Sequence, residues 1–164
     1  MFEPTVIDAT DKATLYGDLE RQLSALLTGE PDLAANAANM SSLLFHALPD
    51  VNWVGFYFLK DQELVLGPFQ GKPACTRIAL GKGVCGTAAS RRRSVIVEDV
   101  ERFPGHIACD SASRAELVVP LIENDRLVGV LDLDSPRLAR FDEQDRLGCE
   151  QLAAALLRAS SFVL

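Results

Sequence analysis

Three of the four cysteines in this sequence lie in short segments that also contain glycine. The segments are GPFQGKPAC (67–75), GKGVCGTA (81–88) and PGHIACDSAS (104–113), which hold Cys75, Cys85 and Cys109. Glycine lets the backbone approach a ligand closely, and loops on a rigid scaffold often carry catalytic groups. This coincidence favours redox-active thiols over inert core cysteines at these three positions. Cys149 lies in a helical pattern, so we expect it to be a small buried residue.

Acidic side chains accompany these cysteines. Asp132 and Asp134 are two positions apart in an apolar strand pattern, so both should point to one face of a sheet. Glu116 begins its own strand soon after Cys109 and is close enough in sequence to join the same pocket. A buried carboxyl group with a raised pKa can donate a proton, and an ionised one can bind an ammonium group. Simple solvent exposure at the end of a strand explains the two aspartates equally well.

Trp53 and Tyr57 are four positions apart in a strand pattern and share a face with Gly55. Aromatic residues at this spacing most often belong to an ordinary core. The functional alternative is a wall that packs against a methyl or thioether group, which suits aromatic rings.

Metal binding is a further alternative. Cys75, Cys85, His106 and Cys109 could form a Cys₃His set. The chain has no CxxC pair, however, so the spacing supports a zinc site only weakly.

Helical patterns flank a strand-rich middle. Short turns between the strands favour an α+β fold with a mostly antiparallel sheet, and the terminal helices should pack together on one face. Asp11 and Asp142 are good N-cap residues for the first and last helices. We expect a single domain over residues 1–164, with helices over 11–48, sheet and active-site loops over 51–135, and a helix over 142–160.

Composition and charge narrow the function. The 164 residues include 16 basic and 23 acidic ones, and the net charge of −7 argues against nucleic-acid binding. The N-terminus has no signal-peptide pattern, and no apolar stretch is long enough to cross a bilayer. These features predict a cytoplasmic protein, where structural disulfides are rare.

The cysteine motifs, together with DVERFPGHIACDSASRAELVVPL and GVLDLDSP, resemble the free methionine-(R)-sulfoxide reductases, which are single GAF-domain proteins. The resemblance runs from about Val51 to Asp145. It implies a GAF-type fold with a sheet of about six strands, a homodimer, and reduction of free but not peptide-bound methionine-R-sulfoxide. It also implies that thioredoxin is the reductant and that no metal or other cofactor is needed.

The same resemblance suggests a role for each candidate residue. Cys109 corresponds to the nucleophile, which would become a sulfenic acid, and Cys75 and Cys85 to the thiols that resolve it as a disulfide. The sequence does not rank these two, although we favour Cys75 as the first resolving thiol. The remaining candidates correspond to substrate-binding and acid-catalysis positions: Glu116, Asp132, Asp134, Trp53 and Tyr57.

Two further expectations follow. The segment from Pro68 to Ala74 is expected to form a lid, with Gly67 and Gly71 as hinges. The alternative to an enzyme is a non-enzymatic GAF module that senses a small molecule or redox state, because fold alone does not fix function.

Overall fold

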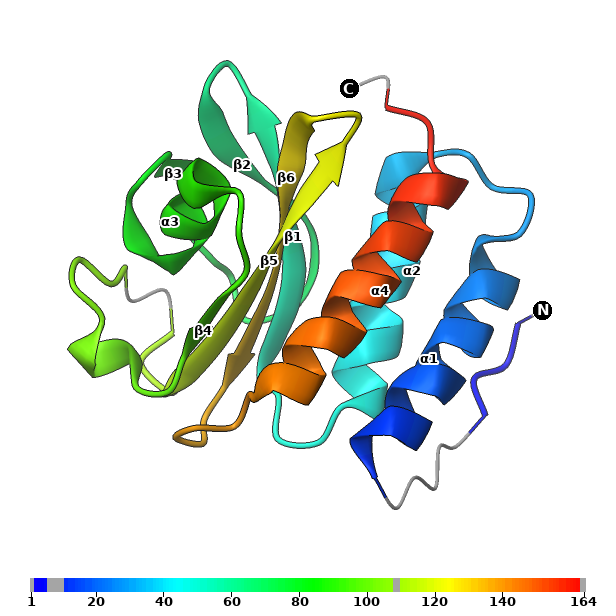
Figure 1. The fold of residues 1–164 in the computed structure, drawn as a ribbon, viewed down its shortest axis with the longest axis horizontal. Coiled ribbons are helices and arrows are strands. Elements are labelled where there is room, and N and C mark those ends of the chain that lie inside the picture. The colour runs from blue at the N-terminus through cyan, green and yellow to red at the C-terminus, as the bar shows by residue number, and fades with distance from the viewer. Residues whose placement is uncertain (1, 6–10, 108–109, 163–164) are drawn as a thin grey trace.

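The computed structural model describes residues 2–5, 11–107 and 110–162. A six-stranded sheet forms the centre, with the strand order β3-β2-β1-β6-β5-β4 and antiparallel pairing between all neighbours (Figure 1). The strands are β1 (Trp53–Lys60), β2 (Glu63–Gly71), β3 (Arg77–Ala79), β4 (Val95–Val97), β5 (Ala115–Glu123) and β6 (Arg126–Ser135). The expected α+β fold with a mostly antiparallel sheet is therefore confirmed.

Helices cover both faces of this sheet, unequally. One face carries α2 (Leu33–Ala47) and α4 (Glu143–Ala159), with α1 (Lys12–Leu27) packed on the outside of these two helices, while the short α3 (Gly83–Arg91) packs on the other face (Figure 1). A 3₁₀ turn, η1 (Val100–Arg102), follows β4. The terminal helices α1 and α4 pack against each other, as expected. Within the described part of the chain, no helix is long and apolar enough to span a membrane.

Both predicted N-caps are present. The Asp11 side chain accepts a hydrogen bond from the Thr14 backbone N–H at 2.8 Å. The Asp142 side chain caps α4 in a reciprocal box with Asp145. These bonds satisfy backbone donors that the first helical turn leaves free.

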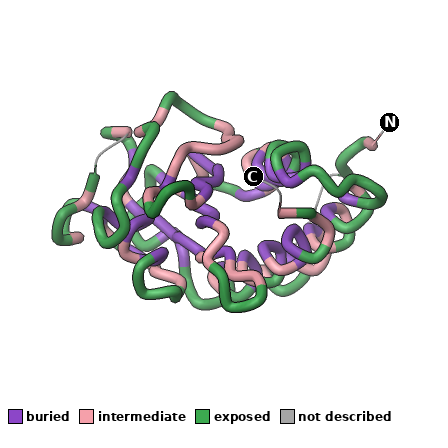
Figure 2. The backbone as a smooth tube through the Cα atoms, turned by 90° about the horizontal axis from the view of Figure 1, so that it is seen from above, coloured by how far each residue is buried: buried purple, intermediate pink, exposed green. Residues whose placement is uncertain are grey.

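Alternation along the strands divides the interior into two apolar clusters. Val54, Phe56 and Phe58 of β1 face the three-helix layer, whereas Trp53 and Tyr57 face the side of α3. Buried residues follow the central strands and the inner sides of the helices (Figure 2). The α3 face, which carries less helical cover, is the face toward which the candidate residues of β1 point.

The prediction of a lid from Pro68 to Ala74 is wrong for the first half of this segment. Pro68–Gly71 belongs to β2, where Gly55 pairs with Phe69 and Trp53 with Gly71 in the β1–β2 ladder. The connecting loop to β3 contains only residues 72–76, which include Cys75. Strand pairing therefore holds Gly67 within the sheet, and it is not a hinge.

Candidate active site

A cavity opens on the α3 face of the sheet, with about 550 Å³ of empty space when the solvent at its mouth is included. Its walls come from β1, β3, β5, β6, the first turn of α3, the loop residues 72–74 and the described residues His106, Ile107, Asp110 and Ser113. Six of the candidate residues line it: Trp53, Tyr57, Cys85, Glu116, Asp132 and Asp134. Four elements separated in sequence thus bring the expected side chains to one pocket.

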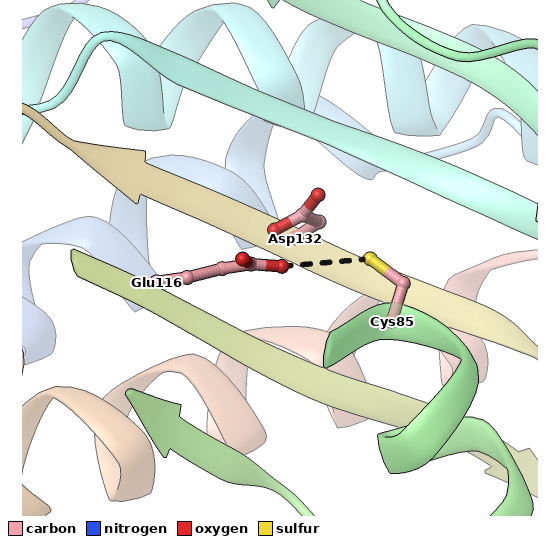
Figure 3. A group of neighbouring side chains, drawn as sticks. All are labelled: Cys85, Glu116 and Asp132. Atoms are coloured by element: carbon pink, nitrogen blue, oxygen red, sulfur yellow. Dashed lines mark hydrogen bonds between the residues drawn. The ribbon is translucent and has the colours of Figure 1, made fainter. Parts of the chain in front are cut away.

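Cys85, Glu116 and Asp132 form a tight cluster at this pocket (Figure 3). The Cys85 thiol donates a hydrogen bond of 3.9 Å to Glu116 Oε1. One atom from each of the three side chains, Sγ or a carboxylate oxygen, lies within 4.8 Å of the others. Glu116 and Asp132 are each only 6% exposed, so simple solvent exposure does not explain Asp132.

Strand register produces this cluster. Glu116 on β5 pairs with Asp134 on β6, and Asp132 pairs with Gly55 on β1. Leu131 and Leu133, between and beside the aspartates, enter the core under the three-helix layer. The alternation predicted from the sequence is therefore confirmed.

Gly55 leaves room for the aromatic wall. A Cβ atom at Gly55 would lie 2.4 Å from Phe69 Cβ and 2.5 Å from the Trp53 ring. Trp53 stacks on Tyr57 and on Phe69, with ring centroids 6.1 and 5.3 Å apart. The three aromatic rings pack across this glycine beside the acidic cluster.

Burial raises the pKa of three acids in the pocket, Glu116, Asp132 and Asp134. The pKa of Asp132 rises from 3.8 to about 7 through burial, opposed by hydrogen bonds with Cys85 and Glu116. Burial and then the neighbouring aspartates raise the pKa of Glu116 well above its usual range. Burial and Asp132 do the same to Asp134, against a hydrogen bond from Ser113. Near neutral pH the cluster therefore holds protons that it can donate.

Cys85 lies in the first turn of α3, a position that normally favours a thiolate. Burial raises its pKa instead, and the charges of Asp132 and Glu116 add to the rise. The side chain is 4% exposed, so its desolvation outweighs the helix terminus. In the resting pocket Cys85 is a neutral thiol.

Cys75 lies outside this cluster. It is half-buried in the loop after β2 and packs against the apolar residues on the α3 side. Two donors from β1 hold its loop: Trp53 Nε1 donates to the Lys72 carbonyl and the Tyr57 hydroxyl to the Cys75 carbonyl, both at 3.0 Å. The aromatic residues thus support the loop as well as lining the cavity.

Cys109, the expected nucleophile, lies outside the described residues. The residues on either side of the gap, Ile107 and Asp110, both line the cavity. The fourth cysteine, Cys149, is fully buried in α4, with its sulfur 3.8 Å from the Tyr16 hydroxyl in the three-helix layer. This placement confirms the expectation that Cys149 is a core residue.

A polar network at the cavity mouth was missed by the sequence reasoning. Asp110 accepts hydrogen bonds from the Ala112 backbone N–H at 2.9 Å and from Asn52 at 3.4 Å, and pairs with Lys72 Nζ at 3.4 Å. Asn52 also donates to Ser113 at 3.2 Å. Asp110 and Ser113 fall inside the CDSAS motif, which was the available signal. Asn52 had none.

His106 was considered only as a metal ligand. Its Nε2 lies 3.7 Å from Glu116 Oε2, and burial lowers the pKa of the imidazole. The ring is therefore mostly neutral near pH 7 and adds little positive charge to the pocket.

Comparison with known proteins agrees with this architecture. Residues 34–159 match the GAF domain, so the fold and the pocket on its α3 face define a GAF-domain protein. Free methionine-R-sulfoxide reductase of Escherichia coli K12 is 51% identical over 146 residues, which are 89% of this chain and 88% of that protein. The enzyme of the same name from Saccharomyces cerevisiae is 42% identical over 160 residues, covering 93% of this chain and 89% of that protein.

A solved structure of free methionine-R-sulfoxide reductase from Neisseria meningitidis, in complex with its substrate, superimposes with a TM-score of 0.93. It is 46% identical and covers 97% of this chain and 95% of that chain. The chain belongs to the free methionine-R-sulfoxide reductase family.

Proposed function

We propose that this protein reduces free methionine-R-sulfoxide to methionine, with a cysteine nucleophile and with thioredoxin as the reductant. One observation carries the proposal: three acidic side chains, an aromatic wall and Cys85 share one cavity, which is also lined by residues 72–74 before Cys75 and by Ile107 and Asp110. The family relationship supports the same reaction.

The charges of the pocket fit a free amino acid. Among the described residues, no Lys or Arg lies within ion-pair distance of Glu116, Asp132 or Asp134. A substrate ammonium group would supply the missing positive charge and would favour ionised carboxylates. Lys72 and Lys82 line the cavity and could bind the substrate carboxylate. A methionine sulfoxide within a peptide has neither charged group, because both are converted to peptide bonds. It would leave the acids and the two lysines of the pocket unpaired.

In the proposed reaction the Cys109 thiolate attacks the sulfoxide sulfur. A protonated carboxyl group of Glu116, Asp132 or Asp134 gives its proton to the sulfoxide oxygen, and the S–O bond breaks. The hydroxyl group passes from the substrate sulfur to the Cys109 sulfur as the bond between the two sulfurs breaks, so methionine leaves with its sulfur reduced and Cys109 becomes a sulfenic acid. The raised pKa values of these acids match the requirement for a proton donor near neutral pH.

A second thiol then condenses with the sulfenic acid to form a disulfide and water. Cys75 suits this step because it is half-buried, whereas Cys85 is 4% exposed and hydrogen-bonded to Glu116. Thioredoxin must reach a sulfur atom of the disulfide to exchange with it, which favours the more exposed partner. We assign Cys75 as the first resolving thiol and Cys85 as a relay behind it.

We also propose a homodimer and a cytoplasmic location, as the family resemblance and the reducing partner imply. Light scattering of the purified protein tests the dimer. A mass close to a single 17.8 kDa chain would contradict it.

A coupled assay tests the reaction itself. Thioredoxin oxidation is followed with free methionine-R-sulfoxide, free methionine-S-sulfoxide and a peptide containing methionine sulfoxide. We expect turnover with the free R epimer only. Comparable rates on the peptide would contradict the substrate, and retained turnover in Cys109→Ser would contradict the nucleophile. Tight binding of the sulfoxide without any turnover would support a sensing module instead.

A further inference from the structure

The proposed reaction uses no metal ion, but the acidic pocket contains a set of atoms that is suited to bind one. Cys85 Sγ and one carboxylate oxygen each of Glu116 and Asp132 lie within 4.8 Å of one another, and all three residues are buried (Figure 3). The separation of Cys85 Sγ from Glu116 Oε1 is 3.9 Å. Tetrahedral zinc, with Zn–S near about 2.3 Å and Zn–O near about 2.0 Å, places two such ligand atoms roughly 3.5 Å apart. The Cys85–Glu116 pair therefore needs a shift of only a few tenths of an ångström to close on an ion, and the 4.8 Å limit places the Asp132 oxygen roughly 1 Å or less beyond the same spacing.

An unpartnered atom gives a second, independent indication. Asp132 Oδ1 is fully buried and has no hydrogen-bond partner within the described structure. Asp132 is 6% exposed and lines the cavity. A buried carboxylate oxygen without a donor carries a desolvation penalty, which a bound cation would remove.

Further ligands are within reach. His106 lies outside the group of three, but its Nε2 is 3.7 Å from Glu116 Oε2 and it lines the same cavity, which places a nitrogen donor beside the group. The opening of the cavity leaves space for a water molecule in any remaining position.

We propose that Cys85, Glu116 and Asp132, with His106, form a site for a thiophilic divalent cation such as Zn²⁺. A thiol, carboxylates and an imidazole favour Zn²⁺, Co²⁺ or Cd²⁺, whereas Mg²⁺ and Ca²⁺ prefer oxygen ligands alone. On binding, the Cys85 thiol and any protonated carboxyl group of Glu116 and Asp132 lose their protons to solvent, and the sulfur and carboxylate oxygens bond to the metal. No electron is transferred.

This site goes beyond the proposed reaction because the ion would inhibit it. The metal would occupy the carboxylates proposed to bind the substrate ammonium group and would hold the Cys85 sulfur away from disulfide exchange. It differs from the Cys₃His set considered from sequence, since two of its ligands are carboxylates. The competition with substrate rests on the proposed function, but the metal site itself does not.

Titration of the reduced protein with Co²⁺ tests the site. Thiolate ligation produces a sulfur-to-cobalt charge-transfer band in the near ultraviolet, which reports Cys85 directly. We expect one equivalent of Co²⁺ to produce the band, and Zn²⁺ to displace it. The band should persist in a Cys75→Ser/Cys109→Ser variant, where Cys85 is the remaining thiol near the pocket, and in the control Cys149→Ala.

Cys85→Ser should abolish the band, and Asp132→Asn should weaken Co²⁺ binding by at least about tenfold. Circular dichroism of each variant checks that it remains folded. A band that survives in Cys85→Ser, or that disappears in Cys75→Ser/Cys109→Ser, would overturn the assignment. So would the absence of any band in the wild-type protein. Because the titration needs no turnover, it can succeed or fail independently of the reductase assay.

Discussion

The Tyr57 hydroxyl donates a hydrogen bond of 3.0 Å to the carbonyl oxygen of Cys75. This bond links the pocket wall on β1 to the loop that carries the proposed resolving thiol. The Trp53 indole N–H makes a parallel bond to Lys72 at the start of the same loop. The wall of the cavity and the position of the Cys75 loop therefore depend on the same two aromatic side chains.

Tyr57→Phe is expected to slow disulfide formation at Cys75. The variant keeps the ring but loses the hydroxyl, and a hydrogen bond worth ~1 kcal/mol corresponds to about a fivefold change in rate. Trapping of the sulfenic acid with dimedone, followed over time by mass spectrometry, measures this step. The only other tyrosine, Tyr16, lies in the three-helix layer, so Tyr16→Phe is the matched control. Equal lifetimes of the sulfenic acid in both variants would remove the support for this link.

Cys75→Ser is expected to release methionine in the first turnover but to lose thioredoxin-supported cycling by more than about tenfold, since exchange requires a disulfide. Cys149→Ala, whose thiol is buried against Tyr16, should cycle normally. Rapid-quench measurement of methionine separates the first turnover from the later ones. Normal cycling in Cys75→Ser would instead assign the resolving step to Cys85.

Asp132 should make the substrate-free protein less stable as pH rises. Its pKa is about 7 in the folded state against 3.8 as a free side chain, so the folded protein retains a proton that the unfolded chain has lost. The free energy of unfolding therefore falls between about pH 4 and about pH 7 and stays lower above that range.

Asp132→Asn removes this titration. We expect it to be more stable than the wild type at pH 8, by a few kcal/mol at ~1.4 kcal/mol per unit of pKa shift, and the difference should shrink toward pH 4. Urea unfolding across this range measures it, with Glu20→Gln on α1 as a control. A stability difference that is the same at every pH would show that Asp132 is ionised in the folded state.

Gly86→Ala should displace α3 and destabilise the protein by ~1–3 kcal/mol. A Cβ atom at Gly86 would lie 2.4 Å from the Ala79 carbonyl oxygen at the end of β3. The matched control is Gly17→Ala on α1, where nothing lies within 4 Å of the added atom. That change should stabilise the protein by ~0.5–1 kcal/mol, the usual gain for alanine in a helix. Thermal unfolding of both variants measures how much the close packing at Gly86, one residue after Cys85, contributes to stability.

Local patterns in the sequence were enough to identify most elements. The spacing of leucines and the caps at Asp11 and Asp142 locate α1 and α4, because helical periodicity and capping are local effects. Asn124 and Asp125 both adopt positive φ in the two-residue turn that joins β5 and β6, as their residue types predict. The two-residue alternation also placed Asp132 and Asp134 on one face.

The end of β2 was not predictable in the same way. Pro68 and Gly71 are typical turn residues, so the sequence suggested a loop from Pro68 onward. Pairing with β1 overrides that local preference and extends the strand to Gly71. Strand pairing joins residues that are distant in sequence, and the propensities of single residues contain no information about such partners.

The sequence by itself determined which side chains were available for chemistry: the cysteine motifs, Glu116 and the two aspartates of β6. Only the tertiary structure decided their environment. It separated the buried Cys85, held beside Glu116, from the half-buried Cys75 on its tethered loop. It also removed Asp132 from solvent and so raised its pKa. Burial and electrostatic coupling depend on the strand register and on helix packing across the sheet, which no single stretch of sequence specifies.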